Sequence, residues 1–275
     1  MKKILLFLIT IVVLCFPSTY VFANNENKTK IAKSFIPSNS VLVSPKKPFS
    51  TSAIQLYDFN QDGRKEMIVT FEIKAKEQPA PSQYGVMVLK KVNNEWEKVW
   101  ETKMQGVDLD FSGLADISGD GIKEYLFGVT IGAALGNELE IFQWNGQTLQ
   151  KIANIPYHAF DLLKGNHQDG LAVWKWYLAD SYLIDVLKWN GKKLTYDKQL
   201  YTKYYPVIEK FYNEKISKMN AWFYWYCLAD AQIKANLFEE ASKSIEKGRM
   251  LAKKLSMPEV VQSFNELSNR LEEKK

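Results

Sequence analysis

Oxygen-bearing side chains occupy four of the five alternate positions in the stretch from Asp58 to Glu66. Positions 1, 3, 5 and 9 are Asp58, Asn60, Asp62 and Glu66, and the backbone carbonyl of Arg64 falls at position 7. Hard oxygen ligands at this spacing are typical of calcium loops, and Gly63 stands where a tight turn needs a positive φ. An EF-hand would need a bidentate acid at position 12, which is Val69 here, so this loop is not an EF-hand.

The same spacing returns in a second stretch that ends at Glu124. Its ligand positions are Asp116, Ser118, Asp120 and Glu124, with the carbonyl of Ile122 at position 7. Both stretches run into β-branched and aromatic segments that predict strands. We predict structural Ca²⁺ at one or two of these loops, although Asp, Asn and Gly also populate plain turns. At affinities typical of extracellular modules, millimolar calcium would add on the order of 1–2 kcal/mol per site.

Three β units are predicted between residues 51 and 197. Each contains a hairpin turn, and these turns are expected at Asn93-Asn94, Asn145-Gly146 and Asn190-Gly191. The third unit has lost the calcium ligands, because the aligned positions hold Leu162, Lys164, Asn166 and Gly170. The fold is therefore expected to continue without a third site.

The pattern Asp-x-Asn/Ser-x-Asp-Gly-x-x-Glu before an apolar strand resembles the calcium loops of FG-GAP and VCBS repeats, the blade units of integrin-type β-propellers. The resemblance covers roughly residues 50–195. It implies that calcium is bound by Asp58, Asn60, Asp62, Arg64 and Glu66, and by Asp116, Ser118, Asp120, Ile122 and Glu124. Three units are fewer than a closed propeller uses, so we expect either a β-propeller-like fold or an open stack of β-meanders.

A helical domain is predicted over residues 203–275, where apolar residues fall at spacings of three and four. We expect helices that begin at Pro206, at about Ala221, at Glu239 and at Pro258. The pair from Trp225 to Ala252 resembles a tetratricopeptide repeat, which implies two antiparallel helices. The positions that carry this resemblance are Trp225, Leu228, Ala229, Phe238, Ala241 and Ile245. The predicted fold class is multi-domain, β and then α.

The first residues predict export. Lys2 and Lys3 precede an apolar run and a small-residue end at Ala23, which is typical of a signal peptide over residues 1–23. A lipoprotein is not expected, because Leu14 precedes Cys15 and bacterial lipoprotein processing requires a small residue at that position. We predict a secreted or extracytoplasmic protein without a transmembrane segment after cleavage, beginning with an extended segment over residues 24–50.

The formal net charge of +5 is too small to indicate nucleic-acid binding. No catalytic motif is recognisable around His158 or His167, so we do not expect an enzyme. After signal cleavage Cys227 has no disulfide partner and is expected in the core.

We predict a binding protein of the bacterial cell envelope that engages another envelope or extracellular protein through its helical part or its β loops. The alternative is a carbohydrate-binding module for cell-wall polysaccharide. It would use aromatic side chains of the third unit, namely Trp174, Trp176, Tyr177 and Tyr182. Packing within the protein is the other expectation for these side chains, and also for the aromatic run from Trp222 to Tyr226.

Overall fold

The structure is a computed structural model that describes residues 19–75 and 80–275, with side chains from residue 27 onward. Most of the predicted signal peptide, including Cys15, lies outside the described residues. No helix in the described part of the chain is long and apolar enough to cross a membrane.

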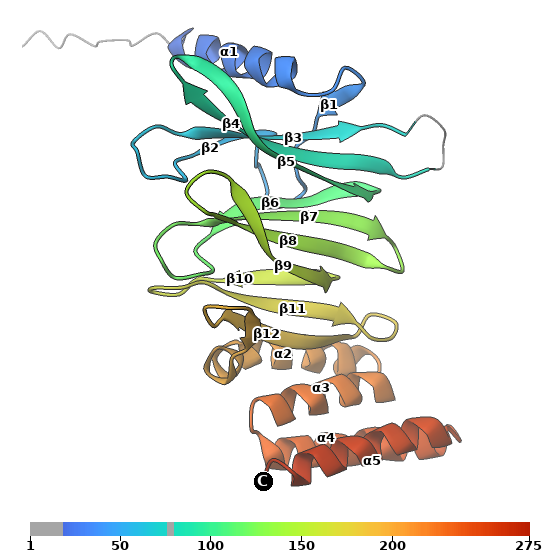
Figure 1. The fold of residues 1–275 in the computed structure, drawn as a ribbon. Helices are drawn as coiled ribbons and strands as arrows, with labels where there is room; N and C mark the ends of the chain where they lie inside the picture. Colours follow the sequence, from blue (N-terminus) through green and yellow to red (C-terminus); the bar gives the residue numbers. More distant parts are fainter. Residues whose placement is uncertain (1–18, 76–79) are drawn as a thin grey trace, which may run out of the picture.

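Three antiparallel sheets follow one another along the chain and are succeeded by helices (Figure 1). The first sheet contains β1 (Ser40–Leu42), β2 (Ile54–Tyr57), β3 (Glu66–Ile73), β4 (Ser82–Val92) and β5 (Glu95–Gly106). The second contains β6 (Asp108–Ala115), β7 (Glu124–Gly132), β8 (Gly136–Trp144) and β9 (Leu149–Tyr157). The third contains β10 (Ala159–Leu163), β11 (Gly170–Trp176), β12 (Tyr182–Trp189) and β13 (Leu194–Tyr196). None of these sheets closes into a barrel among the described residues.

The sheets are stacked because their strands are apolar on both faces. Along β7, Tyr125 and Phe127 enter the core shared with the first sheet, whereas Leu126 enters the core shared with the third. Along β11, Val173 faces the second sheet and Trp174 faces the helices. Successive side chains of a strand point to opposite faces, so each sheet supplies two cores. The predicted β region is thus an open stack of three layers.

The predicted extended segment over residues 24–50 is wrong in its first part. Helix α1 spans Thr19–Phe35 and lies across the outer face of the first sheet (Figure 1). Ala32 is fully buried there, together with Met67 and Phe71 of β3. The polar composition of this segment gave no sign of a helix. The helix is stabilised because it covers an apolar face of the first sheet.

The rest of this N-terminal segment ties the first two sheets together. β1 pairs with β3, and the chain then runs beside β6 in the second sheet. The backbone N–H of Lys46 donates to Leu109 at 3.0 Å, and that of Lys47 donates to Asp110 at 2.8 Å. One short segment therefore adds hydrogen bonds to two layers of the stack.

The helices cover the free face of the third sheet and then each other. They are α2 (Lys198–Lys218), α3 (Trp222–Lys234), α4 (Phe238–Lys254) and α5 (Pro258–Glu272). The predicted boundary at residue 203 and the start at Pro206 are wrong, because α2 begins at Lys198 and contains Pro206. The Asp197 side chain accepts a hydrogen bond from the Leu200 N–H and so caps the helix earlier. The other three helices begin within one residue of their predicted starts.

Two cores hold the helices in place. In the first, Tyr201 and Tyr212 of α2 are buried with Trp174 of the third sheet and Leu228 of α3. In the second, α3 packs on α4 and α5 around Phe264. The aromatic run at the start of α3 divides between these cores, as predicted, and Cys227 is buried.

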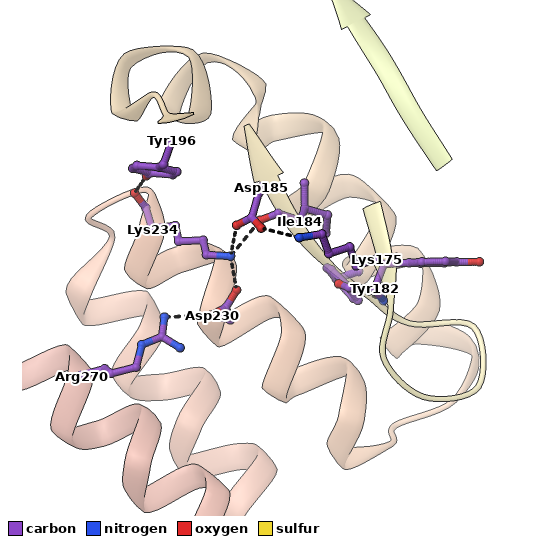
Figure 2. A network of polar contacts seen from close by, with 9 residues as sticks. Lys175, Tyr182, Ile184, Asp185, Tyr196, Asp230, Lys234 and Arg270 are labelled. Atoms are coloured by element: carbon purple, nitrogen blue, oxygen red, sulfur yellow. Dashed lines mark hydrogen bonds and ion pairs between the residues drawn. The ribbon is translucent and has the colours of Figure 1, made fainter. Parts of the chain in front are cut away.

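A polar network joins the third sheet to the helices (Figure 2). The Lys234 ammonium of α3 lies 2.8 Å from Asp185 of β12 and 3.0 Å from Asp230. Arg270 of α5 lies 2.8 Å from the other oxygen of Asp230. Burial acts to lower the pKa of Lys234, but Asp230 and Asp185 outweigh it and raise that pKa above its usual value.

Candidate functional site

The two predicted calcium loops connect β2 to β3 and β6 to β7, and they have the same backbone conformation. Position 4 has a positive φ in both, +56° at Gln61 and +81° at Gly119. Position 6 also has a positive φ in both, +82° at Gly63 and +86° at Gly121. Glycine accepts this region freely, which explains its placement at position 6. The sequence repeat is therefore also a structural repeat.

Three hydrogen bonds recur at equivalent places in the two loops. The position 1 carboxylate accepts from the backbone N–H at position 6, at 2.9 Å for Asp58 and 3.2 Å for Asp116. The position 5 carboxylate accepts from the N–H at position 7, at 2.8 Å for both Asp62 and Asp120. The position 9 carboxylate accepts from the N–H at position 2, at 2.9 Å for Glu66 and 2.7 Å for Glu124. The predicted ligand side chains thus also fold the loops.

The position 9 glutamates are buried, each only 1% exposed. Burial raises the pKa of both Glu66 and Glu124 above the usual range. The second oxygen of Glu124 accepts from the Gln143 side chain at 3.2 Å, and that of Glu66 lies 4.0 Å from the Lys90 ammonium. Both carboxylates therefore anchor a loop to the strand that follows it.

Within residues 19–75 and 80–275, no three His, Cys, Asp or Glu side chains lie close enough together to hold one metal ion. At position 3, the Asn60 amide donates to Asp62 at 2.9 Å, whereas the Ser118 hydroxyl oxygen is buried and has no hydrogen-bond partner among the described residues. An unpaired buried oxygen at a predicted ligand position suits a hard cation. Calcium stays a prediction for both loops.

The loops of successive sheets lie against one another along one edge of the stack. The Tyr57 hydroxyl, just before the first loop, accepts from the Lys123 N–H of the second loop at 2.9 Å. The Asp169 N–H donates to the Asp116 carbonyl at 2.7 Å, and the Asp116 N–H donates to the Asp169 carboxylate at 3.2 Å. The Gln168 side chain donates to the Ile117 carbonyl at 2.7 Å. The third loop, which has lost the ligand pattern, thus keeps its docking role. Sequence reasoning missed Gln168 and Asp169, although an Asp-Gly pair, Asp169-Gly170, also occurs here, three positions later than in the other loops.

The aromatic side chains of the third unit are mostly used inside the protein. Trp174 is buried and donates to the Tyr204 hydroxyl at 3.0 Å, and Tyr182 packs beside it. Tyr177 stacks on Tyr226 with ring centroids 5.0 Å apart. Of the four side chains proposed as a sugar platform, Trp176 alone is exposed, at 46%. Trp176 is the last residue of β11, and its indole donates to the Ala179 carbonyl in the turn that follows.

A cavity of about 490 Å³ opens between α2, α3 and α4, and we call it the helical groove. Its lining residues are Ile216, Asn220, Trp225, Lys247, Met250, Leu251 and Lys254. Met250 is 55% exposed, an unusual position for a flexible apolar side chain. The Lys247 ammonium lies 4.6 Å from the centre of the Trp225 ring. Among the described lining residues two are cationic and none is acidic.

Three elements position this groove. The end of α2 contributes Ile216, the start of α3 contributes Trp225, and one exposed stripe of α4 contributes Lys247, Met250 and Leu251. The Trp225 indole donates to the Asn220 side chain at 2.6 Å, which orients the ring. Sequence reasoning named Trp225 only as a packing residue, because nothing in the sequence shows that α2 ends beside α4.

The sequence matches no family model and no curated protein. What the chain can do therefore follows from its own geometry.

Proposed function

We propose that this is an exported, non-catalytic binding protein that holds a segment of another envelope or extracellular protein in the helical groove. The observation that carries the proposal is the groove itself, an apolar concavity that combines an exposed methionine with a tryptophan ring and cationic margins. Apolar concavities with few polar groups are the usual form of recognition sites. Methionine suits such a surface because its flexible side chain adapts to a partner.

The partner chemistry follows from the lining. Met250, Leu251 and Trp225 would bury an apolar anchor side chain, and Lys247 and Lys254 would face carboxylates on either side of it. Buried anchors of this kind supply most of the binding energy at protein interfaces, and rim charges steer the encounter. We therefore propose a partner segment with one or two large apolar residues flanked by Asp or Glu.

The rest of the fold serves this groove as a scaffold. We propose that the three stacked sheets are a propeller-like array of FG-GAP/VCBS type, and that α3 and α4 are a tetratricopeptide-like hairpin. Structural calcium in one or both loops would stiffen the edge of the stack. The unpartnered Ser118 hydroxyl supports this assignment in the second loop. The ion would neutralise the loop carboxylates, and the protein residues would hold it without chemical change.

Cell-wall polysaccharide binding is the second candidate. The exposed ring of Trp176 favours it, since a tryptophan face can stack on a sugar. Its neighbours in the proposed platform are engaged in the core, so this surface would offer a single ring. The helical groove offers a larger apolar area, and we place the function there.

A peptide-display selection against the purified protein tests the groove. We expect enriched peptides to share an apolar residue next to acidic residues, and to lose binding to the variants Met250→Asp and Lys247→Glu. The matched control is Lys243→Glu, an exposed lysine of α4 outside the groove. Enriched peptides that bind Met250→Asp as well as the parent would refute the groove as the binding site.

A further inference from the structure

A second pocket lies at the opposite end of the stack, between α1 and the α1-facing side of the first sheet, and we call it the basic pocket. Its volume is about 370 Å³. The lining residues are Asn27, Lys28, Ile31, Leu56, Arg64, Lys65, Met67, Lys91 and Trp96. Four of them are cationic and, among the described lining residues, none is acidic. Neither the predicted calcium sites nor the helical groove accounts for this arrangement.

The four cations come from separate parts of the chain. Lys28 belongs to α1, Arg64 and Lys65 to the first loop, and Lys91 to β4. Arg64, Lys65 and Lys91 are exposed and Lys28 is half-buried, so the four cationic groups line a cavity that is open to solvent. A convergence of four cationic side chains from three elements is the feature that a bound anion would stabilise.

Two carboxylates of the first loop lie near another lysine. Asp62 and Glu66 lie 3.8 Å and 4.0 Å from the Lys90 ammonium. Lys90 and Lys91 are neighbours on β4, so their side chains leave opposite faces of the strand. The Lys90 side chain therefore lies near the loop carboxylates, and the Lys91 side chain lies on the face of β4 that lines the pocket.

The floor and one wall of the basic pocket are apolar. Met67 is fully buried beneath it, and Leu56 is its cross-strand partner. Trp96 lies directly opposite Lys91 in the pairing of β4 with β5, so a half-buried indole stands beside a cation. Cationic side chains next to an aromatic wall suit a ligand that has an anionic end and a less polar body.

We propose that the basic pocket binds a phosphoryl group carried on a sugar or polyol body, such as one unit of a phosphate-containing polysaccharide. Arg64, Lys65, Lys91 and Lys28 contact the phosphoryl oxygens, and Trp96 packs against the body. Four cations favour a phosphoryl group over a single carboxylate, because guanidinium and ammonium donors match several oxygens at once. The volume admits one such unit, and a polymer that presents many units would bind with higher avidity.

Calorimetric titration with three probes tests this proposal: glucose 6-phosphate, glucose and inorganic phosphate. We expect saturable binding of glucose 6-phosphate that weakens as salt is raised, weaker binding of inorganic phosphate, and no binding of glucose. Lys91→Glu should weaken glucose 6-phosphate binding at least about tenfold, since it replaces a favourable charge contact with a repulsive one. Trp96→Leu should remove the preference for glucose 6-phosphate over inorganic phosphate.

Two controls keep the outcome specific to this pocket. Lys103→Glu changes an exposed lysine of β5 outside the pocket and should bind as the parent does. Lys247→Glu changes the helical groove and should also leave this binding unchanged, which separates the two sites.

Three results would overturn the proposal. The first is no saturable heat from glucose 6-phosphate up to about 10 mM. The second is equal affinity for inorganic phosphate and glucose 6-phosphate in the parent, which would show that the body is not recognised. The third is sedimentation with phosphatidylglycerol vesicles in the absence of glucose 6-phosphate binding, which would assign the surface to membranes.

Discussion

Replacing Lys234 by methionine should destabilise the junction between the third sheet and the helices. The methionine side chain keeps much of the apolar stem and removes the charge. Among the described residues, Asp230, which is 6% exposed, then keeps only Arg270 as an ionic partner, and Asp185 keeps only Lys175, 3.7 Å away. The Ile184 carbonyl, which accepts from Lys234 at 2.9 Å, also loses a donor.

The expected magnitude follows from these contacts. Removing one partner of a buried ion pair costs about 3–5 kcal/mol when the other charge is left uncompensated. Asp185 is 33% exposed and Arg270 still compensates Asp230, so the ionic loss here should lie below that range. Loss of the hydrogen bond to Ile184 adds about 1 kcal/mol. We expect a total of about 2–4 kcal/mol, which lowers the Tm by roughly 4–16 °C.

The dependence on pH has a definite sign. Burial alone would raise the pKa of Asp185, but Lys234 outweighs it and holds that pKa below its usual value. The stabilisation from Asp185 is therefore present above its unfolded pKa and is lost as pH falls through its lower folded value. The stabilisation from Lys234, whose pKa is raised, is present below its unfolded pKa and is lost as pH rises through the folded value. The difference between Lys234→Met and the parent should shrink at both extremes.

Urea unfolding followed by far-UV circular dichroism measures the change. Lys175→Met is the matched control, because this lysine contacts Asp185 from a position that is 47% exposed, and it should cost no more than about 1 kcal/mol. The double variant Lys234→Met with Asp230→Asn should be more stable than the sum of the single effects predicts, by about 1 kcal/mol or more. If Lys234→Met costs less than Lys175→Met, the network does not hold the junction and the reasoning fails.

Three further changes test other parts of the structure. Calcium should raise the Tm of the parent by roughly 2–8 °C per occupied site relative to chelator, and the gain should fall in Asp120→Ala; identical melting curves would contradict the metal prediction. Gly248→Ala should cost about 1–3 kcal/mol in urea unfolding, because its Cβ would lie 2.2 Å from the buried Phe264 ring, whereas Gly132→Ala, with open space around it, should be nearly neutral. Burial raises the pKa of the Cys227 thiol to about 12, so a disulfide reagent at pH 8 should label it only as the protein unfolds, and rapid labelling of the native protein would show that the thiol is accessible.

The local features were predictable where a few neighbouring residues determine the backbone. Asn93 and Asn94 both adopt positive φ in the turn between β4 and β5, as their side chains allow. The two calcium-type loops likewise follow from their own nine residues, because their side chains bond to backbone N–H groups in the same loop. Sheet order within each unit then follows, since short turns make successive strands neighbours.

The errors lie where a distant surface decides the outcome. Helix α1 forms over a polar segment because the outer face of the first sheet needs cover. The early start of α2 combines the local cap by Asp197 with the burial of Tyr201 against the third sheet. Trp174 is not available to bind a sugar, because helices cover its face of β11. Each of these outcomes depends on contacts between segments that are far apart in the chain.

The sequence by itself determined the two equivalent loops, the three β units and the helical hairpins, because these depend on interactions within about a dozen residues. Only the tertiary structure decided what those elements enclose. The helical groove joins Ile216, Trp225 and Met250 from three helices, and the basic pocket joins α1 with a loop and four strands. The physical reason is that a recognition surface is assembled by packing, and packing brings together side chains whose spacing in the sequence carries no periodic signal.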